Sequence, residues 1–100
     1  HLSLNNIGLK SLKNLPRIKG LYYLSLNNND LSGDDFDLLT TLYPNLEKLK
    51  ISGNIIEKID NLLKLKPLKL RKIEVKENPF SIGNDKYKNK LFASIYCFNN

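Results

Sequence analysis

The sequence predicts an α/β repeat fold, namely a leucine-rich repeat solenoid. We expect a curved, right-handed array with a parallel sheet on its concave side and short helices and 3₁₀ turns on its convex side. Two observations predict it: apolar residues recur with one pattern along the 100 residues, and an asparagine follows that pattern at a fixed position. Such repeats stack because each one buries its apolar face only against its neighbours.

Three segments match the pattern L-x-x-L-x-L-x-x-N-x-L, with isoleucine, valine or phenylalanine in place of some leucines. They are LYYLSLNNNDL at residues 21–31, LEKLKISGNII at 46–56 and LRKIEVKENPF at 70–80. Residues 2–9 match in part, with Ile7 at the asparagine position, and residues 92–100 match in part as well. The pattern therefore extends over the whole chain.

The repeats recur at a regular interval. Counting through Leu2, Leu24, Leu49, Ile73 and Ile95 gives steps of 22, 25, 24 and 22 residues. Leucine-rich repeats are roughly 20 to 29 residues long. We expect residues 1–100 to form a single leucine-rich repeat domain of about five repeats. Because the chain begins and ends within a repeat, we expect this domain to be truncated at both ends.

Each repeat is expected to contribute one short parallel strand. Leu24 and Leu26 alternate with polar residues and should point into the core. The residues between them point outward, and strands paired in register align these outward residues in columns. Tyr23, Lys48 and Lys72 should lie in one such column.

The outward columns are the candidate binding surface for a partner protein. Tyrosine beside mixed charge suits a protein interface, since the ring provides contact area and the hydroxyl a polar group. The alternative is an ordinary solvated sheet face. The predicted partner-binding residues are Tyr23, Ser25, Asn27, Lys48, Lys50, Lys72, Glu74, Lys76 and Tyr96.

The repeated asparagines have a predicted structural role in the turn after each strand. They are Asn29, Asn54 and Asn78. An inward asparagine can bond amide and carbonyl groups of neighbouring turns that would otherwise be buried without partners. In the run of three asparagines, we expect Asn27 on the concave face and Asn28 on the rim.

The connectors between the strands differ in their predicted structure. Residues 34–43 predict a helix, because Ser32 precedes Asp35 by three residues and acids fill the first turn. Residues 11–20 and 60–70 are interrupted by proline and predict single turns or 3₁₀ pieces. Residues 84–95 predict a final helix. We interpret Asp34, Asp35 and Asp37 as helix-capping residues rather than ligands for a cation.

The formal charge of the chain is +6, and all of the excess lies in its second part. The residues before Asn45 include four basic and four acidic ones, whereas those after it include twelve basic and six acidic ones. Lysine supplies nearly all of this charge and acts as a hydrated point charge, which favours diffuse attraction over base reading.

Other residues offer no chemistry for a reaction. His1 is the first residue, and Cys97 occupies an inward strand position that is typical of a small core residue. The glycines lie too far apart for a phosphate-binding loop, and no metal-ligand spacing occurs. We therefore predict a protein that is not an enzyme and has no cofactor, metal, small-molecule substrate or membrane segment.

Several segments resemble the acidic leucine-rich nuclear phosphoproteins, small leucine-rich repeat proteins with a long acidic tail. These segments are residues 7–16, 29–39, 43–56 and 87–92. The resemblance implies a nuclear adaptor that shuttles to the cytoplasm, binds histones as a chaperone or inhibits a serine/threonine phosphatase. Two departures are the basic repeat body and the absence of an acidic tail from these residues.

Related families with similar repeats remain as alternatives. Spliceosomal A-prime-type proteins and phosphatase-regulating leucine-rich repeat subunits share the asparagine turns. A ribonucleoprotein scaffold would use its basic surface near RNA, where aromatic rings beside lysines stack on single-stranded bases. The candidate residues for such contact are Tyr23, Lys48, Lys50, Lys72 and Tyr96.

Overall fold

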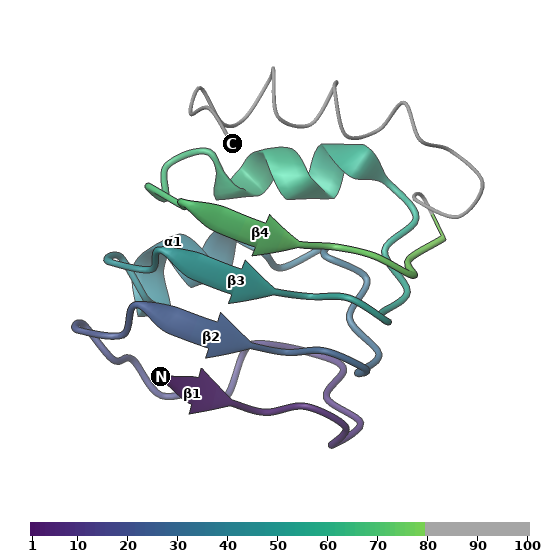
Figure 1. The fold of residues 1–100 in the computed structure, drawn as a ribbon, viewed down its shortest axis with the longest axis horizontal. Coiled ribbons are helices and arrows are strands. Elements are labelled where there is room, and N and C mark those ends of the chain that lie inside the picture. The colour runs from purple at the N-terminus through teal and green to yellow at the C-terminus, as the bar shows by residue number, and fades with distance from the viewer. Residues whose placement is uncertain (80–100) are drawn as a thin grey trace.

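The computed structural model describes residues 1–79. Four short parallel strands form one sheet in the order β1-β2-β3-β4, which is also their order along the chain (Figure 1). The strands are β1 (Leu2–Ser3), β2 (Tyr23–Ser25), β3 (Lys48–Lys50) and β4 (Lys72–Glu74). Each is short because the polar turn of its repeat begins directly after the alternating residues.

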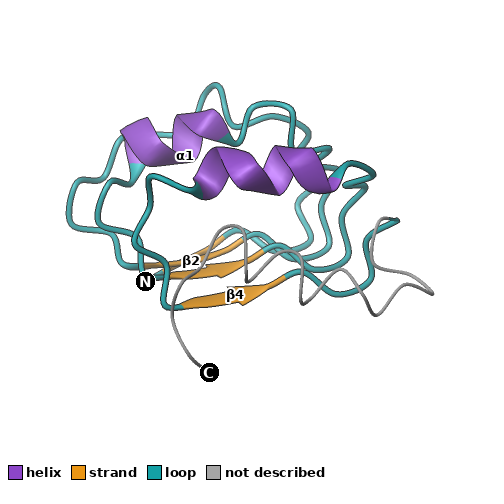
Figure 2. Cartoon of the chain, turned by 90° about the horizontal axis from the view of Figure 1, so that it is seen from above, coloured by secondary structure: helices purple, strands orange, loops and turns teal. Residues whose placement is uncertain are grey.

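Two helices lie in the connectors. The α-helix α1 (Asp37–Leu42) connects β2 to β3, and the 3₁₀-helix η1 (Ile59–Leu65) connects β3 to β4. Figure 2 shows both helices on the same side of the sheet. The chain is therefore a small α/β domain with a four-stranded parallel sheet, which is compatible with the predicted leucine-rich repeat fold.

The strand register confirms the repeat spacing. Leu2 pairs with Leu24, Leu24 with Leu49, and Leu49 with Ile73. These pairs are the ones that the count along the sequence predicts. The backbone ladder continues beyond the strands, since the amide of Asn28 donates to the carbonyl of Ser52 at 2.8 Å.

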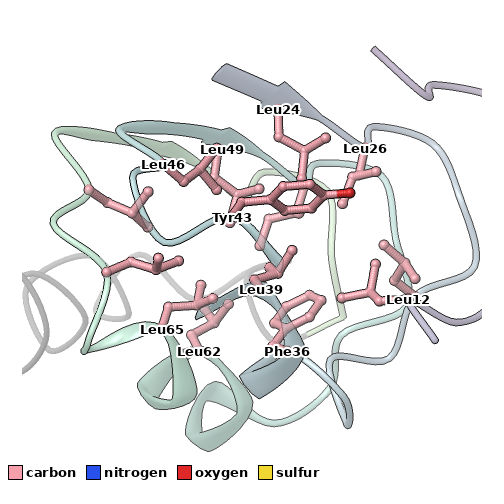
Figure 3. Close-up of a cluster of buried hydrophobic side chains, with 14 of the residues drawn as sticks. Leu12, Leu24, Leu26, Phe36, Leu39, Tyr43, Leu46, Leu49, Leu62 and Leu65 are labelled. Carbon is pink, nitrogen blue, oxygen red and sulfur yellow. The ribbon is translucent and has the colours of Figure 1, made fainter. Parts of the chain in front are cut away.

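The core lies between the sheet and the helices (Figure 3). Leu24 and Leu49 reach it from the sheet, and Phe36, Leu39 and Leu62 reach it from the connectors. Each of these five side chains is at most 1% exposed. Full burial of such a side chain is worth about 1.5 to 3 kcal/mol, so stacking of the repeats supplies the main stabilisation.

The predicted helix at residues 34–43 is shorter than expected. The structure has a turn at Asp34–Phe36, and α1 begins at Asp37 with no side-chain cap. The reason is that Asp35 points to the preceding repeat, where its Oδ2 accepts hydrogen bonds from the amide of Leu12 at 2.8 Å and the hydroxyl of Ser11 at 3.0 Å. The interpretation of Asp35 as a helix cap was therefore wrong.

The two proline-interrupted connectors contain no α-helix among the described residues. The second contains η1, which confirms the predicted 3₁₀ structure and ends two residues before Pro67. The first forms turns without a regular helix. The fifth repeat, the predicted helix at 84–95, and the positions of Tyr96 and Cys97 lie outside the described residues.

Candidate functional site

The candidate binding surface is the sheet face that points away from α1 and η1, called the open face here. Its exposed or half-buried side chains are Tyr23, Lys48, Lys50, Lys72, Glu74 and Lys76. The pairing places Tyr23 beside Lys48 and Lys48 beside Lys72, so these three residues form the predicted column. Among residues 1–79, no helix covers this face (Figure 2).

Tyr23 lies beside a cluster of basic side chains. The ammonium nitrogens of Lys48 and Lys50 lie 5.9 Å and 5.6 Å from the centroid of its ring. The ring of His1 stacks on the ring of Tyr23, with 4.1 Å between the two ring centroids. Each exposed cation–π contact contributes about 0.5 to 1 kcal/mol. These contacts hold the tyrosine ring in place on the open face.

The lysines of the open face differ in their partners. Lys50 Nζ lies 4.0 Å from Glu74 Oε2. The interaction with Tyr23 and, to a smaller extent, the charge of Glu74 raise the pKa of Lys50. Within residues 1–79, Lys48, Lys72 and Lys76 form no ion pair. The open face therefore has a net positive charge.

Two of the residues predicted to contact a partner, Ser25 and Asn27, form hydrogen bonds within the protein instead. Ser25 is only 4% exposed, and its hydroxyl donates to Asn5 Oδ1 at 2.8 Å. Ser25 is therefore not part of the exposed surface, which corrects the sequence-based prediction. Asn27 is half-buried, and its Oδ1 accepts a hydrogen bond from the amide of Ser52 at 2.8 Å.

Asn29 lies inside the turn and connects two repeats. Its Nδ2 donates to the carbonyls of Leu4 at 2.9 Å and Leu26 at 3.1 Å. Its Oδ1 accepts from the amides of Ile7 at 3.1 Å and Leu9 at 3.0 Å. The side chain thus satisfies polar backbone groups of both repeats at once.

Asn54 repeats this arrangement one repeat later. Its Nδ2 donates to the carbonyls of Leu26 and Ile51, both at 3.0 Å, and its Oδ1 accepts from the amide of Leu31 at 3.1 Å. Asn78 bonds the carbonyl of Ile51 in the same way at 3.0 Å. The three asparagines form a ladder beneath the ends of the strands.

The residue before each asparagine of the ladder has a left-handed backbone, and so has Asn6, which precedes Ile7 at the same position of the first repeat. The φ angles are 58° at Asn6, 59° at Asn28, 68° at Gly53 and 58° at Glu77. Glycine and asparagine tolerate this conformation best. This role of Asn28 was not predicted from the sequence, although asparagine or glycine stands at this position in three of the four described repeats, as Asn6, Asn28 and Gly53.

A second polar network connects the helix side of the repeats. Asn61 Nδ2 donates to Asp34 Oδ1 at 3.0 Å and to the carbonyl of Ser32 at 3.1 Å. The ammonium group of Lys64 donates to the carbonyl of Asp34 at 2.6 Å. Asp34 thus binds the following repeat, as Asp35 binds the preceding one.

The described part of the chain shows no arrangement for metal binding. No group of three histidine, cysteine, aspartate or glutamate side chains lies close enough to hold an ion within residues 1–79. In the same range, none of the helices has the length and apolar character needed to span a membrane. The described part of the open face presents one tyrosine, on which His1 stacks, four lysines and one glutamate.

Comparison with known proteins gives a consistent group of relatives, although no protein-family model matches the chain. An acidic leucine-rich nuclear phosphoprotein 32-related protein of Plasmodium falciparum is 37% identical over 96 residues, which cover 94% of this chain and 34% of that protein. The related protein 2 of Caenorhabditis elegans is 39% identical over 98 residues, which cover 94% of this chain and 42% of that protein.

A third relative comes from rice, Oryza sativa subsp. japonica. This acidic leucine-rich nuclear phosphoprotein 32-related protein 1 is 32% identical over 95 residues, or 95% of this chain and 20% of that protein. The chain thus spans between 20% and 42% of the length of these three relatives. The similarity covers nearly all of the chain and only a part of each relative.

Proposed function

Because the chain belongs to the acidic leucine-rich nuclear phosphoprotein 32 family, we propose that it is a non-enzymatic protein-binding module of the nucleus. The open face supports this proposal, since it presents Tyr23 among lysines on a rigid sheet. An aromatic ring with a polar group suits protein contact. Shuttling to the cytoplasm is part of the same proposal.

We further propose that residues 1–100 form one leucine-rich repeat domain and that the parallel sheet is the concave side of a solenoid. Four strands in register, with helices on one side only, support this arrangement. The asparagine ladder supports it as well, because each asparagine bonds the repeat before its own. A fifth repeat at residues 92–100 would extend the same sheet.

The family resemblance implies two kinds of partner, histones and a serine/threonine phosphatase. The charge of the open face favours one of these two partners. Histones are basic, and the open face has four lysines and one glutamate. Like charges across an interface disfavour association. We therefore propose that the open face binds and inhibits a phosphatase, and that any histone chaperone activity uses another part of the intact protein.

The test is a binding titration with a serine/threonine phosphatase catalytic subunit and, in parallel, with core histones. The double variant Tyr23→Ala with Lys48→Ala removes the ring and one cation of the open face. We expect it to weaken phosphatase binding at least tenfold, or about 1.4 kcal/mol, while circular dichroism shows that the variant is still folded. Unchanged affinity for both partners in this variant would contradict an interface at the open face.

A ribonucleoprotein scaffold is the second candidate, favoured by the lysines around the ring of Tyr23. Phosphate contacts predict that affinity for a short RNA falls steeply as salt increases. Saturable RNA binding with this salt dependence, together with no binding of phosphatase or histones, would favour this candidate over the first.

A further inference from the structure

The lysines of the open face are held close to one another. Lys48 on β3 and Lys72 on β4 are paired directly across adjacent strands. Adjacent strands lie about 4.8 Å apart, and like charges placed opposite each other destabilise a sheet. Lys76 follows on the same face, and within residues 1–79 none of these three lysines has an ion-pair partner.

The lysines cannot separate by a change of register. Leu49 pairs with Ile73 in the same strands, and Leu49 is 1% exposed. A shift by one residue would move these apolar side chains to solvent, so their burial keeps the lysine backbones in place. A bound anionic group would relieve the repulsion between their ammonium groups.

Glu74, the acidic residue in the described part of the open face, already has partners for both carboxylate oxygens. Glu74 Oε2 lies 4.0 Å from Lys50, and Glu74 Oε1 accepts from the hydroxyl of Ser52 at 3.4 Å. Its charge therefore opposes an incoming anion less than an unpaired carboxylate would. The column of Tyr23, Lys48 and Lys72 remains open to such a group.

We propose that the open face binds a carboxylate-rich peptide segment of a partner protein, laid across the strands from Tyr23 toward Lys72 and Lys76. This inference rests on the proposed function and specifies the chemistry of its partner. A carboxylate accepts charge-assisted hydrogen bonds from lysine, and the ring of Tyr23 packs against the apolar part of the peptide.

A peptide suits the open face better than single-stranded nucleic acid. Nucleic acid binding of that kind uses several aromatic rings on which successive bases stack. The described part of the open face has the ring of Tyr23, on which only the ring of His1 stacks, and no arginine. Lysines attract carboxylates as point charges, and without a row of aromatic rings this part of the open face offers successive bases no surface for stacking.

The test uses the whole chain and a fluorescent glutamate-rich peptide, with a glutamine-rich peptide of equal length as reference. Binding is followed by anisotropy at low and at physiological salt. We expect binding of the glutamate peptide only, and at least a roughly tenfold loss in the double variant Lys48→Gln with Lys72→Gln. Circular dichroism checks that the variant is folded.

The matched control is Lys13→Gln with Lys66→Gln, which removes the same charge from two exposed lysines outside the sheet. We expect it to change the affinity less than about twofold. Lys48→Arg with Lys72→Arg keeps both charges and should keep binding, which separates charge from folding. Equal losses in the two glutamine variants would overturn the inference, because the effect would then reflect net charge alone.

Two further outcomes distinguish this inference from the proposed function. If the chain binds the phosphatase or histones and not the glutamate peptide, the carboxylate inference is wrong and the protein-binding module stands. If a short RNA binds through Lys48 and Lys72 more tightly than the peptide, the inference is also overturned, in favour of a ribonucleoprotein role.

Discussion

At residue scale, the three consecutive asparagines of the second repeat have three different roles. Asn27 accepts from the amide of Ser52 in the next repeat. Asn28 has a left-handed backbone with φ of 59°. Asn29 bonds backbone groups of two repeats from a buried position, with 5% of its surface exposed. The three asparagines thus supply a hydrogen bond to the next repeat, a left-handed turn and a buried side chain that bonds two repeats.

Replacement of Asn29 by alanine is expected to lower the free energy of unfolding by about 1 to 3 kcal/mol, because buried backbone groups lose their partners. Chemical denaturation measures this change. The control is Asn28→Gly, which keeps the left-handed backbone and should cost less than about 1 kcal/mol. Similar losses in both variants would contradict the assignment of Asn29 to the interior.

Gly53 is expected to tolerate no side chain. Its φ is 68°, and an added Cβ would meet the side-chain oxygen of Asn28. We expect Gly53→Ala to lower the free energy of unfolding by about 1 to 3 kcal/mol. Gly20→Ala is the matched control, since its Cβ would meet nothing within 4 Å and its φ is not positive. An equal cost at Gly20 would argue against backbone strain as the cause.

Tyr43 is fully buried, and its hydroxyl is a buried side-chain polar atom without a hydrogen-bond partner in the described part of the chain. Burial raises the pKa of Tyr43. A raised pKa favours folding below the unfolded pKa of about 10, and this contribution is lost as pH rises beyond it.

We therefore expect Tyr43→Phe to leave the free energy of unfolding unchanged at pH 7 or to raise it by up to about 1 kcal/mol. Above a pH of about 10, the variant should lose less stability than the original chain. Urea denaturation across this pH range measures both effects. A loss of more than about 1 kcal/mol at pH 7 would show that the hydroxyl has a stabilising partner.

At the scale of elements, contacts between neighbouring connectors define the helix side of the domain. The turn before α1 directs Asp35 to the preceding connector, and Asp34 binds Asn61 in η1. The sequence pattern correctly predicted a helix here. It also predicted that these acids cap the helix, whereas α1 has no side-chain cap. Contacts between connectors decide the position of Asp35, because its carboxylate gains more from two donors in the preceding repeat than from a fraying helix end.

Asp35→Ala is expected to lower the free energy of unfolding by about 1 to 3 kcal/mol, since the amide of Leu12 loses its acceptor. The control is Asp37→Ala in the exposed first turn of α1, where the helix dipole alone contributes about 0.3 to 1 kcal/mol. Thermal or chemical unfolding compares the two variants. A larger effect at Asp37 would restore the capping interpretation.

At the scale of the whole molecule, positive charge is concentrated on the sheet while the core is almost entirely apolar. The formal charge of +6 and the pair of Lys48 with Lys72 on the open face oppose folding through repulsion. We expect moderate sodium chloride to raise the melting temperature, since the Debye length falls to about 8 Å at physiological ionic strength. A melting temperature that falls with salt would mean that attractive ion pairs dominate.

The sequence by itself determined the order and register of the strands. The steps between Leu2, Leu24, Leu49 and Ile73 predict the observed pairing, because burial of these residues allows one register only. It also indicated the 3₁₀ structure of η1 through the proline that follows, and the buried place of Asn29 through its position after the strand.

Only the tertiary structure decided which polar side chains reach solvent. Ser25 alternates like an outward residue, yet Asn5 of the neighbouring repeat accepts its hydroxyl and leaves it 4% exposed. Asp35 resembles a cap and binds Leu12 instead. In both cases the partner lies in another repeat, and the distance between repeats is set by packing of the core, which local sequence patterns do not encode.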